Sequence, residues 1–198
     1  MDAARREILL DAGRVFLLLP VFLALWYFVA PGLGVVAGKF AQPVVRLMAD
    51  GSTSMANKER VLIYTVKLEV PYQRGRVSPR IAADVEVNAA KFTYGIALFL
   101  ALAIAARESR KALPIIAGCL ALLVTPFFGI AFDALKQLGA VPGLAPFLGW
   151  GTAKREFVAL AYQVGTLLLP TLLPVAIWLV LVRARWAPRS IAPEGAST

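Results

Sequence analysis

The stretch VFLLLPVFLALWYFVAPGLGVVAG, residues 15–38, contains no charged side chain, and it decides how the chain must fold. Three more stretches, 89–106, 112–132 and 157–182, are equally apolar, and Lys91 is their one charged residue. A helix needs roughly 20 apolar residues to cross a bilayer core of about 30 Å. Because hydrocarbon offers no water to an unpaired peptide group, such stretches must be helical. The sequence therefore predicts a mainly α, integral membrane protein with a bundle of four transmembrane helices.

The overall composition supports the same class of protein. The 198 residues are 59% hydrophobic and have a mean hydropathy of +0.71, which exceeds what a soluble domain of this size shows. A net charge of +9 would also suit a nucleic-acid-binding protein, but that class needs basic side chains clustered on one soluble face. Here the basic residues mostly flank the apolar stretches, as in membrane proteins. We therefore expect contact with membrane lipid and no nucleic-acid partner.

Groups that carry chemistry are scarce. Histidine is absent, and the one cysteine, Cys119, lies inside the third apolar stretch. An intrachain disulfide and a zinc site of the usual Cys/His kind are thus excluded, and we interpret Cys119 as a packing residue. The apolar stretches hold no deep His, Asp or Glu for general acid–base catalysis, and no phosphate-binding Gly-x-x-x-x-Gly-Lys-Ser/Thr loop occurs. We expect no catalytic residue, no cofactor, no metal site and no enzyme activity.

The basic residues predict the topology. Three short segments, before the first stretch, between the second and third, and after the last, hold nine of the 21 basic residues: Arg5, Arg6, Arg14, Arg107, Arg110, Lys111, Arg183, Arg185 and Arg189. The positive-inside rule places these segments, and so both termini, in the cytoplasm. Residues 1–38 then form the N-terminus and first span, and residues 183–198 a disordered cytoplasmic tail. A cleaved signal peptide ending near residue 37 is the competing reading, but the stretch is too long for one.

Residues 39–88 are the only sizeable soluble segment, and this topology places them outside the cytoplasm. Phe40, Val44, Leu47 and Met48 recur with helical spacing, which predicts a short amphipathic helix lying on the membrane surface. Residues 51–54, which are Gly and small polar residues, are expected to be flexible.

Beyond residue 54 the apolar residues alternate, which predicts a β-hairpin turning at residues 73–76. Its apolar face consists of Leu62, Tyr64, Val66, Leu68, Val70, Ile81, Ala83, Val85 and Val87. Because a lone hairpin is marginal in water, this face must be covered. Either the chain or the membrane covers it, or it is a docking platform for a partner, with free edges that could pair with an extended peptide. In the second case Tyr64, Val66, Val85 and Val87 make the partner contacts.

Residues 89–182 should hold three further transmembrane helices. Thr125-Pro126 in the third helix predicts a bend, and Pro170 with Pro174 in the fourth predicts a second one. The connection at residues 133–156 is expected to be an interfacial loop, lying in the membrane interface or against a partner. Asp133 and Lys136 at its start are spaced for an exposed i, i+3 ion pair.

The last helix carries a polar stripe. Glu156, Gln163, Thr166 and Pro170 follow at spacings of seven, three and four, which places them on one side. A polar stripe on a spanning helix should face other helices rather than lipid. Glu156 could be a buried ion pair or a proton site, or simply an interfacial charge at a helix start. We expect Glu156, Tyr162 and Gln163 to make contacts with a partner helix.

Several short motifs resemble one known family. They are Leu25-Trp26-Tyr27 ahead of Pro31, Tyr94-Gly95, Phe128-Gly129 leading into Phe132-Asp133-x-Leu135-Lys136, and Arg155-Glu156-x-x-Ala159-Leu160-x-Tyr162-Gln163-x-Gly165. Over most of its length the chain is similar to the exosortase H-associated membrane proteins, and the motif in the last helix is the most specific.

The resemblance implies a multi-pass protein of the bacterial cytoplasmic membrane. Members accompany an exosortase, a multi-spanning cysteine transpeptidase of protein sorting, and the companion itself carries no known activity. This chain has no histidine and cannot be the transpeptidase. The sequence thus predicts a non-catalytic accessory subunit. The alternative is a small transporter or channel subunit with a polar path near Glu156 and Gln163.

Overall fold

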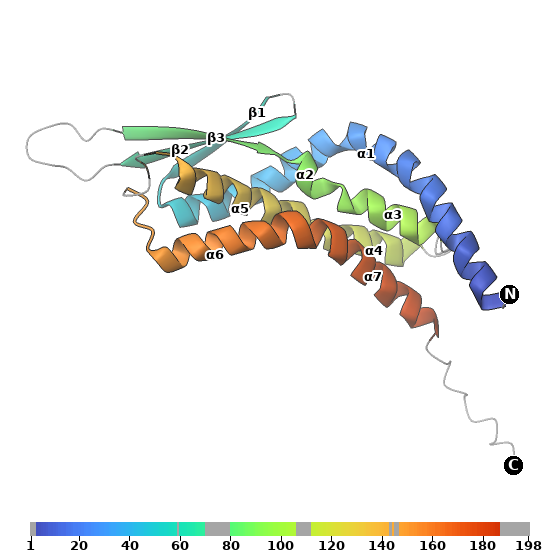
Figure 1. Cartoon of the computed structure of the whole chain (residues 1–198). Coiled ribbons are helices and arrows are strands. Elements are labelled where there is room, and N and C mark those ends of the chain that lie inside the picture. The colour runs from blue at the N-terminus through green and yellow to red at the C-terminus, as the bar shows by residue number, and fades with distance from the viewer. Residues whose placement is uncertain are drawn as a thin grey trace, which may run out of the picture.

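The computed structural model describes residues 3–58, 60–69, 80–105, 112–142, 144 and 147–186 (Figure 1). The predicted hairpin turn at 73–76, the basic segment at 107–111 and residues 187–198 lie outside this part of the chain. The elements follow in the order α1 (Ala3–Ala49), β1 (Ser52–Lys58), β2 (Val61–Glu69), β3 (Arg80–Asn88), α2 (Ala90–Thr93), α3 (Gly95–Ala105), α4 (Ala112–Leu122), α5 (Val124–Ala140), α6 (Thr152–Gln163), the π-helical η2 (Val164–Leu168) and α7 (Leu169–Trp186).

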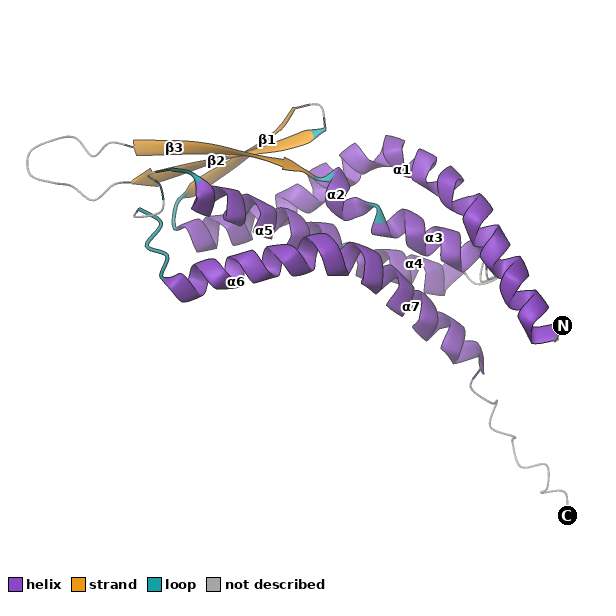
Figure 2. Ribbon diagram, in the orientation of Figure 1, coloured by secondary structure: helices purple, strands orange, loops and turns teal. Residues whose placement is uncertain are grey.

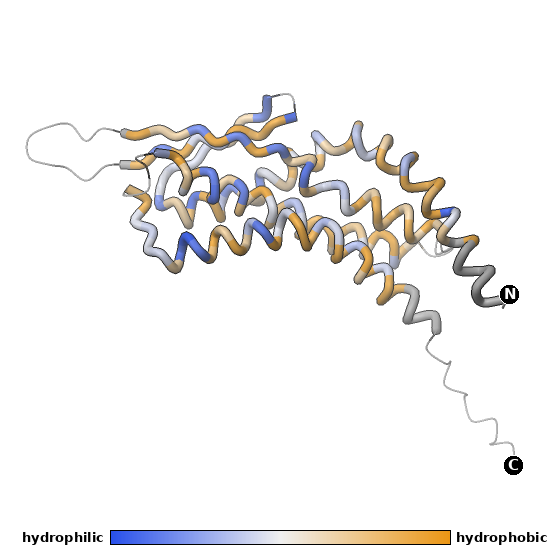
Figure 3. The backbone as a smooth tube through the Cα atoms, in the orientation of Figure 1, coloured by the Kyte–Doolittle hydropathy of each residue, from blue (hydrophilic) through white to orange (hydrophobic). Residues whose placement is uncertain are grey.

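The fold is mainly helical, as predicted. Three described helical segments are long and apolar enough to cross a membrane, namely Ala12–Ala49, Ala112–Ala140 and Thr152–Leu181. The second predicted span, at residues 89–106, corresponds to Ala90–Ala105, a shorter apolar helix about 24 Å long at 1.5 Å per residue. Figure 3 shows that hydrophobic positions concentrate in α3, α4 and α7, whereas hydrophilic positions are frequent in the sheet and at the start of α6.

The helix α1 extends well beyond the predicted first span. It is continuous for 47 residues, through Pro20, Pro31 and Pro43, and so is about 70 Å long. The separate amphipathic helix expected after residue 38 is therefore wrong, because that segment is the second half of α1. Its faces differ in burial, since Val45 is fully buried whereas Leu47 is 82% exposed.

The soluble segment forms a three-stranded antiparallel sheet instead of a two-stranded hairpin. The strands have the order β1-β2-β3, with Tyr64 opposite Val85 and Met55 opposite Tyr64. Strands β2 and β3 lie where the alternation predicted them. The expectation of a flexible segment at residues 51–54 is wrong from Ser52 on, because β1 pairs along its whole length with β2.

The chain itself covers the apolar face of the sheet. Leu62, Tyr64, Val66, Val85 and Val87 are at most 3% exposed, and they form one core with the second half of α1 and with α5. The buried hydroxyl of Tyr64 has a hydrogen-bond partner, because Tyr64 Oη donates to Gly38 O at 2.7 Å. Figure 2 shows the sheet lying along these helices. Coverage within the chain, the first of the two sequence-based alternatives, is what the structure shows.

Both predicted proline bends coincide with helix irregularities. The helix breaks between α4 and α5 at Leu123, because Pro126 has no N–H to donate to the carbonyl of Leu122. Just beyond the break, α5 approaches its neighbours closely at Gly129, where a Cβ would collide with the ring of Phe92. The second irregularity, at Pro170, belongs to the candidate site described below.

The connection between α5 and α6 packs on the chain's own α1. Leu144, Leu148 and Trp150 are at most 5% exposed. Trp150 Nε1 and Lys154 Nζ both donate to Met48 O, at 3.0 and 2.9 Å. The predicted loop at 133–156 is shorter than expected, since α5 continues to Ala140 and α6 begins at Thr152.

The two ends of the molecule differ. The beginning of α1, the end of α3, the beginning of α4 and the end of α7 gather at one end (Figure 1). The sheet and the connection from α5 to α6 lie toward the other end. In the sequence, the basic segments predicted to be cytoplasmic directly adjoin these four helix termini.

Candidate partner-binding site

The last helical segment changes its winding where prolines enter it. Pro170 cannot donate to the carbonyl of Thr166, and the preceding turn is the π-helix η2, in which Leu169 N–H donates to Val164 O. Isolated π turns occur frequently at functional sites. The turn also brings Gly165 close to α5, where an added Cβ would lie 3.2 Å from Gly129 Cα.

The predicted polar stripe is divided by this turn. Pro170 is buried and its carbonyl oxygen faces Gly95. The buried Thr166 Oγ1 has no hydrogen-bond partner within the described segments. These two residues face other helices, as expected. Glu156 and Gln163 are exposed on α6, and within the described part of the chain no hydrogen bond or ion pair is found for either.

The α6 helix is held firmly on α5. Lys136 Nζ lies 3.9 Å from the centroid of the half-buried Tyr162 ring. The rings of Phe132 and Phe157 make an edge contact with centroids 5.7 Å apart. These contacts determine which side of α6 faces α5, and therefore leave Gln163 on the exposed side.

An apolar surface surrounds the two exposed polar residues. Glu156, Leu160, Gln163 and Leu167 follow at spacings of four, three and four and are all exposed, Leu160 to 61% and Leu167 to 66%. We call these four residues the α6 face. The 4-3-4 spacing is the one with which a helix presents side chains to a partner helix.

The other four predicted contact residues, Tyr64, Val66, Val85 and Val87, lie in the core beneath the sheet. The fold places α5 between them and α6 (Figure 1). None is more than 3% exposed, so they have no surface to offer a partner in this structure. The structure therefore does not bring the two predicted sets together. Of the predicted contacts it exposes Glu156 and Gln163, whereas Tyr162 is half-buried.

The outer strands of the sheet are also tied to the chain. Gln42 Nε2 donates to Thr53 O on β1 at 2.6 Å, and Gln137 Nε2 donates to Glu86 O on β3 at 2.8 Å. Each outer strand thus has one carbonyl bonded to a neighbouring helix. The two bonds leave less open backbone for an added peptide strand than a free hairpin would have.

Asp133 is a buried acid that the sequence-based interpretation placed on the surface. It is only 4% exposed, it accepts a hydrogen bond from Gln137 Nε2 at 3.2 Å, and its Oδ2 finds no hydrogen-bond partner among the residues that the structure describes. The expected exposed pair with Lys136 is wrong, because the lysine turns to Tyr162 instead. The signal was available, since Asp133 interrupts an otherwise apolar run from residue 127 to 135.

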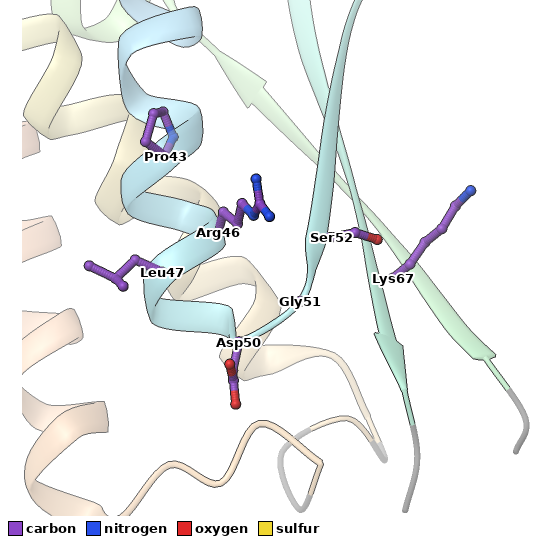
Figure 4. A pocket seen from close by; sticks show the side chains of 7 residues that line it. All are labelled: Pro43, Arg46, Leu47, Asp50, Gly51, Ser52 and Lys67. Atoms are coloured by element: carbon purple, nitrogen blue, oxygen red, sulfur yellow. The ribbon is translucent and has the colours of Figure 1, made fainter.

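Two hollows escape sequence reasoning altogether. One, of about 570 Å³, opens between the end of α1 and the start of the sheet, and its lining includes Arg46, Asp50 and Lys67 (Figure 4). The other, of about 370 Å³, is lined only by apolar residues of α1, α4 and α5. Within the described residues, no three His, Cys, Asp or Glu side chains gather where a metal ion could bind. The candidate function of the described surface is therefore binding to another molecule.

The comparison with known families agrees with this picture of a helical membrane protein. The family of exosortase H-associated membrane proteins matches residues 6–185 of the 198. No curated protein and no solved structure matches the chain significantly. Since the match extends from the first turns of α1 to the last turn of α7, the chain belongs to the exosortase H-associated membrane protein family.

Proposed function

We propose that this protein is a non-catalytic accessory subunit of a bacterial exosortase sorting system, and that it contacts the exosortase through the α6 face. The observation that carries the proposal is Gln163, an exposed amide on a long apolar helix for which the described residues supply no hydrogen-bond partner. An amide facing lipid costs free energy that a hydrogen bond across a helix interface recovers. The exposed Leu160 and Leu167 supply apolar area on both sides of it.

The proposed topology has four crossings of the cytoplasmic membrane, by α1, by α2 with α3, by α4 with α5, and by α6 through α7. Both termini are cytoplasmic, and the sheet is on the opposite side. The gathering of the helix ends at one end of the molecule supports this arrangement (Figure 2), as do the basic segments next to them.

The replacement Gln163→Leu tests the proposed contact. With tagged protein coexpressed with its exosortase and extracted in mild detergent, we expect the variant to retain about threefold less exosortase. That figure corresponds to the average of about 0.6 kcal/mol for a hydrogen bond between membrane helices. The matched control is Asn57→Leu, which places the same side chain at an exposed position on β1. Equal recovery of exosortase by Gln163→Leu, by the control and by the unaltered chain would show that the α6 face is not the contact.

A transporter or channel subunit gains no support from the site. Glu156 and Gln163 are exposed on the outside of α6, so a polar path along them would need several chains around it. A homo-oligomer that conducts ions in liposomes would favour that function over the accessory role.

A further inference from the structure

The second half of α1 has a buried side and an exposed apolar side. The buried side, which carries Val45, belongs to the core that α1 shares with the sheet and with α5. On the opposite side, Val36, Phe40 and Leu47 are 50, 68 and 82% exposed, and Pro43 between them is exposed as well. We call these four exposed residues the α1 row. Their spacings of four, three and four keep them on one side of the helix.

The apolar hollow of about 370 Å³ links the α1 row to a membrane-spanning helix. Val36 and Phe40 line this hollow together with apolar residues of α4 and α5. These two helices make up Ala112–Ala140, one of the segments long and apolar enough to cross a membrane. Because no polar side chain lines the hollow, and because lipid hydrocarbon surrounds such a segment, an acyl chain is the group that fits there.

The charged face of the sheet points away from the α1 row. The inner face of the sheet packs on the buried side of α1, and Lys67, Asp84 and Glu86 are exposed on the outer face. Figure 1 shows that α1 changes direction between its first and second halves. The layers match those of a helix at a membrane surface, which has its apolar side in the hydrocarbon and its polar side in water.

One flank of the α1 row is basic. Lys39 and Arg46 are exposed and lie roughly two turns apart on the same flank. Among the residues that the structure describes, no ion pair is found for either. Arg46 reaches into the gap between α1 and β1, where it lines the hollow of about 570 Å³, and the carboxylate of Asp50 points away from it (Figure 4). Two cations beside an apolar surface attract the phosphate of an anionic lipid.

We propose that the α1 row and its basic flank bind an anionic phospholipid, with its phosphate at Arg46 and Lys39 and an acyl chain over Phe40 and Val36 in the apolar hollow. Phe40 and Val36 precede Arg46 by six and ten residues, which is about 9 and 15 Å along the helix. One leaflet contains roughly 15 Å of hydrocarbon, so a single lipid reaches from Arg46 to the hollow. The inference goes beyond the proposed function, because the chain binds this lipid without an exosortase.

Native mass spectrometry of the purified full-length chain tests the headgroup contact. The probes are phosphatidylglycerol, which is anionic, and phosphatidylethanolamine, which is zwitterionic, and we expect the first to bind more tightly. Arg46→Gln and Lys39→Gln should each weaken phosphatidylglycerol binding by about fivefold. The matched control Lys58→Gln removes the same charge at the exposed end of β1 and should leave binding unchanged. Equal affinities for the two lipids, or an Arg46→Gln chain that binds phosphatidylglycerol as the control does, would overturn the proposal.

Two further measurements test the acyl-chain contact. Phe40→Asn should weaken the binding of both lipids alike, because it removes apolar area beside the hollow and changes no charge. An excess of inorganic phosphate, which supplies the anion without an acyl chain, should not displace phosphatidylglycerol. Displacement by inorganic phosphate would show a site for free anions, and unchanged lipid binding by Phe40→Asn would place the acyl chain elsewhere; either result contradicts the proposal.

Photo-crosslinking in the membrane identifies what covers the α1 row. With a benzophenone side chain at Phe40 and the exosortase coexpressed, we expect adducts with lipid, and none from the control position Ala82, which is exposed on the sheet. Adducts of position 40 with the exosortase or with a second copy would show that protein covers the α1 row, and the lipid site would be wrong. If no exosortase copurifies with the unaltered chain, the proposed function fails and the lipid site stands.

Discussion

Tyr64 shows how one polar atom is accommodated in the apolar core beneath the sheet. Its side chain is fully buried, and its hydroxyl donates to Gly38 O in α1. The bond links the central strand to the helix beneath it. Burial raises the pKa of the Tyr64 phenol well above its ordinary value of 10.0, because the phenolate would lose its hydration.

This raised pKa predicts a specific alkaline instability. Above pH 10 the unfolded chain loses the Tyr64 proton while the folded chain keeps it, so stability falls as pH rises. The stability contributed by the protonated Tyr64 is fully present below pH 10. Above pH 10 the free energy of unfolding falls by about 1.4 kcal/mol per pH unit, until the raised pKa is reached. We expect Tyr64→Phe to remove this component and to lower stability at neutral pH by about 1 kcal/mol, through the lost hydrogen bond.

Thermal unfolding of the two proteins in detergent between pH 8 and 11.5 measures the effect. The control is Tyr27→Phe, because Tyr27 is 52% exposed. Parallel pH profiles for the unaltered chain and Tyr64→Phe would contradict the assignment.

The strands β2 and β3 could be predicted from the sequence because large apolar side chains alternate along them, whereas the mostly polar strand β1 could not. The alternation of β2 and β3 reflects one buried face, and the structure confirms both strands. The β1 sequence STSMANK offers only Met55 as a large apolar residue. Its pairing therefore depends on backbone hydrogen bonds, which leave no periodic pattern of apolar residues in the sequence. The continuity of α1 was missed for a similar reason, because Pro43 and the change of pattern after Gly38 indicated a new element.

The tethers of the outer strands give a prediction at this scale. Replacing Gln42 by Leu removes the bond to Thr53 O and should loosen β1, whereas replacing Gln137 by Leu removes the bonds to Glu86 O and to Asp133 Oδ1 and should loosen β3. A net loss of about 1 kcal/mol per bond corresponds to roughly fivefold faster local opening. Hydrogen exchange read by mass spectrometry resolves the two strands. Each variant is the control for the other, and equal acceleration of both strands in either variant would show that the tethers are not local.

For the whole molecule, hydropathy predicted the apolar helices, and charge predicted which segments share an end. Neither could show that the sheet lies along α1, because that depends on pairs distant in sequence such as Arg60 with Tyr27. The same division applies to the candidate contact residues on α6. The spacing of Glu156 and Gln163 was visible in the sequence, but their exposure follows from the packing of Tyr162 on Lys136.

The number of crossings is the prediction that the whole molecule decides. The end of α1 meets the connection that follows α5, through Met48 and Trp150, so α1 and α5 end close together. The proposed topology therefore requires the chain to return across the membrane between the sheet and α4, and the described part available for this is Ala90–Ala105. At about 24 Å this helix is shorter than a bilayer core, a mismatch that local thinning accommodates at modest cost.

Cysteine labelling in spheroplasts checks the four crossings. In a Cys119→Ser background, a membrane-impermeant maleimide should label Ser54→Cys on β1 and Ala153→Cys on α6, both exposed positions. A cysteine added after Thr198 should react only after lysis. Labelling of Ser54→Cys without labelling of Ala153→Cys in intact spheroplasts would mean an odd number of crossings between β1 and α6, and then Ala90–Ala105 could not carry the chain back.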